Sequence, residues 1–145
     1  MKQHYIYLIL LSLLTVACQP SPSVSDQNIV TAHKMFEAFN QHQWELMASY
    51  YADSALFLDP SLGKAYIRQS QKDIAAKYMA LQQAFPDIND SITALYSSGE
   101  HVIVEFTSTG TVNDSISFTL PIITVLSFHN GKIIRDATYY DQENP

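Results

Sequence analysis

The chain has 145 residues, 14 of them acidic and 8 basic, and its formal net charge is −6. An acidic chain without a basic run repels phosphate backbones, which excludes nucleic acid as an expected partner. After removal of a leader, the length suffices for one domain with its own core, and the single cysteine excludes an internal disulfide.

Residues 1–17 are predicted to be a signal peptide. Lys2 supplies a basic start, and the apolar run from Tyr5 to Leu14 is shorter than the roughly 20 residues that cross a membrane. The next residues, Leu-Thr-Val-Ala-Cys at 14–18, resemble the lipobox of bacterial lipoproteins, although Thr15 stands where a leucine is usual.

The lipobox resemblance implies acylation of Cys18 and cleavage before it, which would anchor the protein in the cell envelope. Gln19 is not the aspartate that retains enterobacterial-type lipoproteins in the inner membrane, so the resemblance implies the outer membrane. Ordinary secretion with unmodified Cys18 is the alternative. The Pro/Ser-rich residues 18–25 are predicted to be a tether, followed by a domain at residues 26–145.

Two helices are predicted at the start of the domain. Apolar residues at helical spacing between Ile29 and Phe39 form one stripe, which Ser25 or Asp26 can cap. A short helix rich in aromatic residues is expected around Trp44–Tyr51.

A short strand and a third helix follow. Ala55–Leu58 is a strand candidate that ends at Asp59-Pro60. Ser70 and Asp73 have the spacing of a capping box, and Pro86 ends the helix that they begin.

The rest of the chain alternates as strands do. Strands are predicted at Ser91–Tyr96, Val102–Thr107, Ser115–Phe128 and Lys132–Asp141, and Asn130-Gly131 predicts a tight hairpin. Helices first and antiparallel strands afterwards predict an α+β fold with the helices on one face of a curved sheet.

A series of motifs resembles the SnoaL-like family. They are Phe39–Leu46, Tyr50–Ala55, Asp59-Pro60, Phe85-Pro86-Asp87, His101–Phe106, Gly110-Thr111, Asn130–Ile133 and Tyr139-Tyr140-Asp141. The family belongs to the cone-shaped superfamily of ketosteroid isomerase, scytalone dehydratase and nuclear transport factor two. The resemblance implies a cone-shaped, curved antiparallel sheet around the helices, with an apolar pocket at one end. It does not specify a reaction, because this superfamily hosts many.

The aromatic residues are the expected lining of that pocket. The expected ligand pocket consists of Phe36, Trp44, Tyr50, Tyr51, Phe57, Asp59 and Tyr78. For any single aromatic member, ordinary core packing is the more common role, and contact with a ligand is the alternative.

Asp141 is the expected catalytic group if the protein is an enzyme, with His101 or a tyrosine as its helper. Enzymes of this superfamily place a carboxyl group in the apolar cone, where burial raises its pKa and suits it to proton transfer. Asp59 and Glu105 are further candidates, and each can instead be a turn or surface residue.

Other chemistries are not expected. Epoxide-hydrolysing relatives carry an Asp–Arg–Asp network, but Thr138 stands at one acid position and Val102–Phe106 contains no arginine. The histidines lack the convergent spacing of zinc ligands, so neither a metal nor a cofactor is expected.

Two functions remain open: a module that binds a small apolar or amphipathic molecule without catalysis, and an isomerase, cyclase or dehydratase with one carboxylate as general acid/base. The lack of a paired-acid motif favours binding. A carboxylate inside the cone within reach of a tyrosine or histidine would favour the enzyme. A homodimer is expected through the open sheet face, which carries Ile103 and Ile123.

Overall fold

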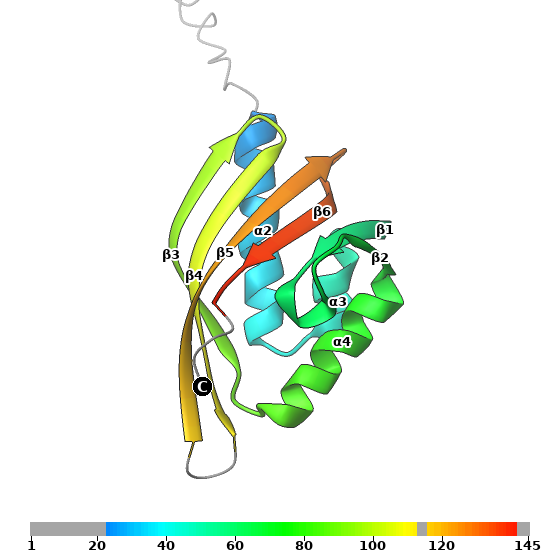
Figure 1. The fold of residues 1–145 in the computed structure, drawn as a ribbon. Helices are drawn as coiled ribbons and strands as arrows, with labels where there is room; N and C mark the ends of the chain where they lie inside the picture. Colours follow the sequence, from blue (N-terminus) through cyan, green and yellow to red (C-terminus); the bar gives the residue numbers. More distant parts are fainter. Residues whose placement is uncertain (1–22, 113–115, 142–145) are drawn as a thin grey trace, which may run out of the picture.

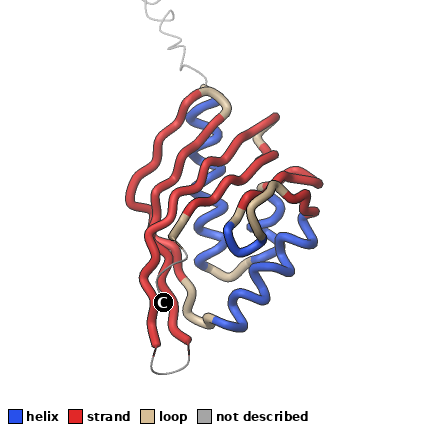
Figure 2. Tube along the Cα trace, viewed as in Figure 1, coloured by secondary structure: helices blue, strands red, loops and turns tan. Residues whose placement is uncertain are grey.

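The helices of the protein lie on one side of a strongly bent sheet (Figures 1 and 2). The structure is a computed structural model, and it describes residues 23–112 and 116–141. In chain order the elements are α2 (Val24–Asn40), α3 (Trp44–Ser49), β1 (Tyr51–Leu58), the 3-10 helix η1 (Pro60–Leu62), β2 (Ile67–Ser70), α4 (Gln71–Ala84), β3 (Asn89–Ser98), β4 (His101–Val112), β5 (Ile116–His129) and β6 (Lys132–Tyr139). The predicted signal peptide and Cys18 lie outside the described residues.

Two helices begin with capping boxes. Ser70 and Asp73 start α4 as predicted, each side chain bonded to the other's backbone N–H. The start predicted for α2 is wrong by two residues, because Ser23 and Asp26 form the same reciprocal arrangement. This capping box has an acidic residue three positions after the cap, and Asp26 stands at that position after Ser23. The helix therefore includes the end of the predicted tether.

The α+β class is confirmed, and the sheet is mixed. Its strand order is β2-β1-β6-β5-β4-β3, with β1 parallel to β6 and all other neighbours antiparallel. The hairpin at Asn130-Gly131 turns the chain back so that β6 enters beside β1 in the same direction. This one parallel pair departs from the wholly antiparallel sheet that the sequence predicted.

The core fills the concave side of the sheet. In β4, Val102, Val104 and Phe106 are buried and face the helices, whereas Ile103 is exposed on the outer face. The long strands β3, β4 and β5 bend around α2, while β1, β2 and α4 close the other end (Figure 1). Within the described part of the chain, none of the helices is long and apolar enough to cross a membrane.

Candidate functional site

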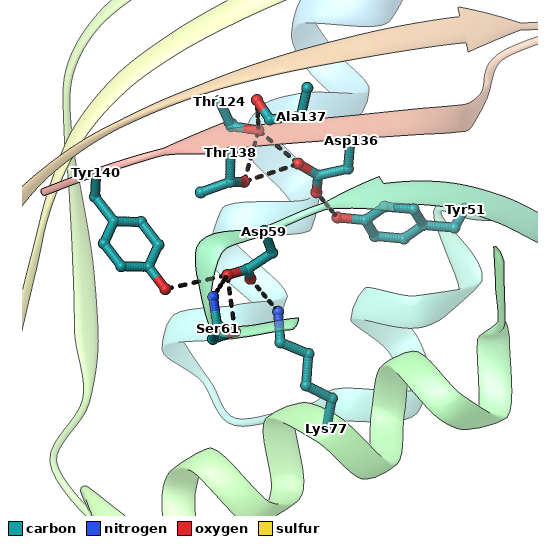
Figure 3. A network of polar contacts seen from close by, with 9 residues as sticks. All are labelled: Tyr51, Asp59, Ser61, Lys77, Thr124, Asp136, Ala137, Thr138 and Tyr140. Atoms are coloured by element: carbon teal, nitrogen blue, oxygen red, sulfur yellow. Dashed lines mark hydrogen bonds and ion pairs between the residues drawn. The ribbon is translucent and has the colours of Figure 1, made fainter. Parts of the chain in front are cut away.

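A buried carboxylate on β6 joins three strands inside the cone (Figure 3). Asp136 is only 5% exposed. Its Oδ2 accepts a hydrogen bond of 2.7 Å from the Tyr51 hydroxyl of β1. Its Oδ1 accepts bonds of 2.6 Å from Thr124 of β5 and 3.0 Å from Thr138 of β6. Three hydroxyl donors therefore converge on one carboxylate.

Tyr51 is held in its protonated form by this arrangement. Burial raises the pKa of the Tyr51 hydroxyl well above its ordinary value, and the negative charge of Asp136 raises it further. The phenol therefore acts as a permanent donor to Asp136.

A second carboxylate lies where β1 ends. Asp59 caps η1, and its Oδ1 accepts bonds of 2.8 Å from the backbone N–H of Ser61 and 2.7 Å from the Ser61 hydroxyl. The hydroxyl of Tyr140 donates to the same oxygen at 3.1 Å, and Lys77 of α4 forms an ion pair with Oδ2 (Figure 3). Both oxygens of Asp59 thus have donors within the protein.

The ion pair keeps both partners charged. Burial alone would raise the pKa of Asp59, but Lys77 and Ser61 outweigh it and hold that pKa below its ordinary value. Burial alone would lower the pKa of Lys77, but Tyr78 and Asp59 together raise it. Asp59 is therefore ionised at neutral pH and is a weak base.

Aromatic rings surround the ammonium group of Lys77. Its Nζ lies 4.7 Å from the ring centroid of Tyr78 and 5.9 Å from that of Phe57, distances at which a cation is attracted to a ring. Phe57 in turn stacks on Tyr51 with a centroid separation of 5.2 Å. Burial raises the pKa of Tyr78 to about 12.

This cluster reaches solvent at one end. The side chains of Lys77 and Asp59 are 17% and 11% exposed, and Tyr78 and Tyr140 are partly buried. By contrast, Tyr51 is only 1% exposed. The cluster thus has a sealed end at Asp136 and a partly open end at Lys77, which we call the cone mouth.

The structure brings together four of the residues predicted for the pocket: Tyr51, Phe57, Asp59 and Tyr78. The other three lie apart from the carboxylates. Trp44 is buried and stacks on Tyr78 with a ring-centroid separation of 6.2 Å. Phe36 packs edge-to-face on Phe106. Tyr50 is partly buried and packs against the core.

Asp141 and His101 are not brought together with these carboxylates. Asp136, Thr138 and Tyr140 contribute their side chains to the network, whereas Tyr139 is 52% exposed. Asp141 itself is exposed just beyond the end of β6.

His101 is also exposed, at the beginning of β4. It pairs with Ser127, which pairs in turn with Arg135 of β6, and its Nδ1 is 3.1 Å from the Ser127 hydroxyl. Because the next residue, Val102, is buried in the core, alternation directs His101 to the outer face of the sheet. The sequence leaves the inward face of β6 open because Tyr139 and Tyr140 are equally apolar.

Six residues of the cluster were not predicted: Ser61, Lys77, Thr124, Asp136, Thr138 and Tyr140. A signal existed for one of them, because Lys77 is three residues after buried Ile74 and so falls on the inward stripe of α4. The position of Asp136 depends on which face of β6 is inward, and the sequence leaves that ambiguous.

Comparisons with known proteins agree with this architecture. Residues 32–136 match a family model described as SnoaL-like domain. No curated protein is similar in sequence.

Solved structures of the same fold are similar over most of their length. A hypothetical protein with a ketosteroid isomerase-like fold from Catenulispora acidiphila, in complex with trimethylamine, has a TM-score of 0.70 at 18% identity, covering 77% of this chain and 85% of its own. A putative SnoaL-like polyketide cyclase from Jannaschia has a TM-score of 0.70 at 15% identity, with 85% and 91% covered.

An LEH-like epoxide hydrolase from M. tuberculosis has a TM-score of 0.70 at 15% identity, with 82% and 86% covered. At such identities the similarity establishes the fold and leaves the reaction open.

Proposed function

Because the chain belongs to the SnoaL-like domain family, we propose that its cone binds a small apolar or amphipathic molecule without catalysing a reaction on it. The observation that carries this proposal is that protein donors occupy both carboxylates of the cone. Asp136 accepts from three hydroxyls, and Asp59 accepts from Ser61, Lys77 and Tyr140.

Asp59 is not arranged for proton transfer. A general acid needs a proton to give, and a general base needs a free lone pair directed at the substrate. Asp59 is kept ionised by Lys77, and its lowered pKa makes it a poor base. We therefore assign Asp59 to holding the cone in shape, and in this proposal the three hydroxyl bonds to Asp136 give that carboxylate the same role.

The cone mouth supplies the groups that would hold a ligand. The ammonium of Lys77 has three donors, of which Asp59 takes one, so an acceptor on the ligand can receive another. The rings of Phe57 and Tyr78 lie beside the same atom. An apolar molecule with a carboxylate, carbonyl or hydroxyl end fits this combination. The trimethylamine complex of the Catenulispora protein supports the idea that this fold accommodates small molecules.

Replacement of Lys77 by methionine tests this assignment. Trp44 is the single tryptophan and stacks on Tyr78, so its fluorescence should report a ligand at the mouth. We expect dodecanoate to bind the full chain and dodecyltrimethylammonium to bind it more weakly. Lys77→Met should weaken dodecanoate binding at least tenfold in a fluorescence titration.

The matched control is Lys72→Met, which changes an exposed lysine on the same helix and should leave the affinity unchanged. If Lys77→Met folds poorly because Asp59 loses its partner, the double variant Asp59→Asn/Lys77→Met restores neutrality. Dodecanoate affinity equal to that of the unmodified chain in these variants would rule out a ligand at the cone mouth.

An isomerase, cyclase or dehydratase with general acid/base chemistry is the second candidate. The buried hydrogen bond of 2.7 Å between Tyr51 and Asp136 favours it, because an acid beside a phenol can pass a proton through the pair. Hydrogen–deuterium exchange at the α-carbon of a ketone, catalysed by the full chain and abolished in Asp136→Asn, would support this candidate over simple binding.

We also propose that the protein is a lipoprotein anchored in the outer membrane through Cys18, as its lipobox-like segment implies. Metabolic labelling with a fatty-acid analogue should mark the natural chain and leave Cys18→Ser unlabelled. Cys18→Ser should also move from the membrane fraction to the soluble or unprocessed fraction. Absence of label on the natural chain would refute the anchor.

A homodimer through the outer sheet face completes the proposal. Pro121, Ile123 and Tyr139 border a shallow hollow of about 300 Å³ there, with Ile123 and Tyr139 paired across β5 and β6. A second copy can place the same apolar patch against this one. We expect sedimentation velocity to show a dimer at micromolar concentration and Ile123→Glu to be monomeric. A monomeric natural chain at high micromolar concentration would contradict this.

A further inference from the structure

A chain of hydrogen bonds joins the loop between α2 and α3 to α4 and to the residue that precedes β3. The indole Nε1–H of Trp44 donates to Oε1 of Gln82 at 2.8 Å, and Nε2 of Gln82 lies 2.8 Å from Nδ1 of His42. On the other side of the ring, Nε2 of His42 lies 3.1 Å from the carbonyl oxygen of Ile88. This chain is separate from the carboxylate network of the cone.

The two ends of the chain fix the direction of every hydrogen bond in it. An indole N–H can only donate, so the amide oxygen of Gln82 faces Trp44 and the amide nitrogen faces His42. That nitrogen can only donate, which makes Nδ1 of the imidazole an acceptor. At the other end the Ile88 carbonyl can only accept, so Nε2 carries the proton. Both ends therefore require the same neutral form of His42.

A second proton on His42 has no place in this arrangement. It would reside on Nδ1 and face the N–H donors of the Gln82 amide. Rotation of the amide would bring its oxygen to His42, but the amide nitrogen would then face the indole N–H of Trp44. The single amide oxygen thus satisfies either the indole or the imidazolium.

Trp44 depends on this oxygen because it is buried. Its side chain is only 3% exposed, and a buried N–H without an acceptor is destabilising. The His42 ring stacks on the indole with a centroid separation of 5.2 Å and an interplanar angle of 22°. His42 itself is partly buried, so protons from solvent can reach the ring.

Only uncharged groups contact the imidazole. Among the described residues, its hydrogen-bond and ring partners are Gln82, Ile88 and Trp44. Tyr78 stays neutral because burial raises its pKa to about 12, whereas the pKa of Asp90, raised by burial to about 6, lies in the range where histidines titrate. The titratable groups closest in sequence to His42 and its contacts are Glu37, Glu45, Tyr78, Asp87 and Asp90.

We propose that His42 is a pH-sensitive latch, whose protonation draws the Gln82 amide oxygen away from Trp44 and loosens the α2–α3 loop from α4. One proton is taken from solvent, and the indole N–H loses its acceptor. Trp44 stacks on Tyr78, whose ring lies 4.7 Å from Nζ of Lys77, so the change reaches a ring of the cone mouth. The latch operates in the free protein, and the proposal does not depend on ligand binding.

An NMR titration of the isotope-labelled full chain in a nonionic detergent, between about pH 8 and pH 5, tests the latch. Trp44 is the single tryptophan, so one indole N–H resonance reports on it. We expect His42 to be the Nε2–H tautomer at the upper pH, and the indole resonance to move upfield in step with the His42 ring nitrogens as the pH falls. His42→Phe keeps a ring against Trp44 but takes up no proton, so it should abolish the movement.

Two controls separate His42 from other titrating groups. His33→Gln removes an exposed histidine of α2, and Asp90→Asn removes the carboxyl group that titrates in the same range. Both variants should retain the movement of the indole resonance. Its loss in either variant would assign the titration to that group and overturn the latch.

Gln82→Glu tests the competition for the single oxygen without removing the histidine. A carboxylate has two acceptor oxygens and can receive the indole N–H and the imidazolium N–H together. We expect this variant to raise the proton affinity of His42 about tenfold and to keep the indole resonance in place throughout the titration. An indole resonance that is immobile in the natural chain, or that moves unchanged in His42→Phe or Gln82→Glu, would contradict the proposal. If one of these two variants does not fold, the other decides.

Discussion

Replacing Asp136 with alanine is expected to lower the free energy of unfolding by about 3–5 kcal/mol. The substitution removes the acceptor of Tyr51, Thr124 and Thr138 and leaves their hydroxyl groups buried or partly buried without it. Hydrogen bonds to a charged group contribute about 1.5–3 kcal/mol each, and a buried donor without an acceptor carries its full desolvation cost. The loss should appear in urea denaturation as a lower midpoint.

Two further variants separate the network from a general effect of losing an acidic residue. Tyr51→Phe removes one of the three bonds and should cost about 1–2 kcal/mol. Asp53→Ala changes an exposed aspartate on β1 and should stay within about 0.5 kcal/mol of the natural chain. A cost below about 1 kcal/mol for Asp136→Ala would mean that this carboxylate does not hold β1, β5 and β6 together.

Replacing Asp90 with asparagine is expected to stabilise the protein at pH 7 by on the order of 2–3 kcal/mol. Burial raises the pKa of Asp90 from 3.8 to about 6, so ionisation of this group is less favourable in the folded state than in the unfolded state. A shift of one pKa unit corresponds to about 1.36 kcal/mol. Asparagine fills the same space without carrying the charge.

The pH dependence gives this prediction its sign. The pKa of Asp90 is higher in the folded state than in the unfolded state. The folded protein therefore has its full stability from this group below pH 3.8, where Asp90 is protonated in both states, and loses that stability as the pH rises to about 6. The advantage of Asp90→Asn should therefore be large at pH 7 and small near pH 4 in urea denaturation. Asp59 has a lowered pKa, so its contribution to the stability of the protein is lost as the pH falls. The natural chain and Asp90→Asn both contain Asp59, and its effect cancels in their difference. An equal advantage at both pH values would contradict the prediction.

Local signals in the sequence predicted much of the fold. The Ser70–Asp73 pair gave the beginning of α4, because a capping box depends on residues only three apart. Asn130 and Gly131 both adopt positive φ angles, as the predicted hairpin turn requires. Alternation in β4 identified Val102 and Val104 as inward residues, and both are buried.

Features that depend on distant partners were not predictable in the same way. Strand β2 has four residues and exists through its pairing with β1, and the parallel pairing of β1 with β6 joins segments far apart in the chain. Strand β1 begins at Tyr51, earlier than expected, because Tyr51 pairs with Ile133 of β6 and the first residues of the strand show little alternation of their own.

The candidate site shows the same division. Phe57, Asp59 and Tyr78 were expected at the pocket because an apolar cone needs aromatic lining and a carboxylate near its mouth. Asp136 and Thr124 were missed, since polar residues on a strand usually predict a solvent-facing side. Here they face inward because each satisfies the other.

Native mass spectrometry of the protein extracted from the membranes of its host tests the proposed function most directly. We predict a noncovalently bound small molecule on a chain that begins at acylated Cys18, and loss of that molecule in Lys77→Met but not in Lys72→Met. A natural protein that carries no bound molecule, or a molecule retained equally by Lys77→Met, would contradict ligand binding at the cone mouth.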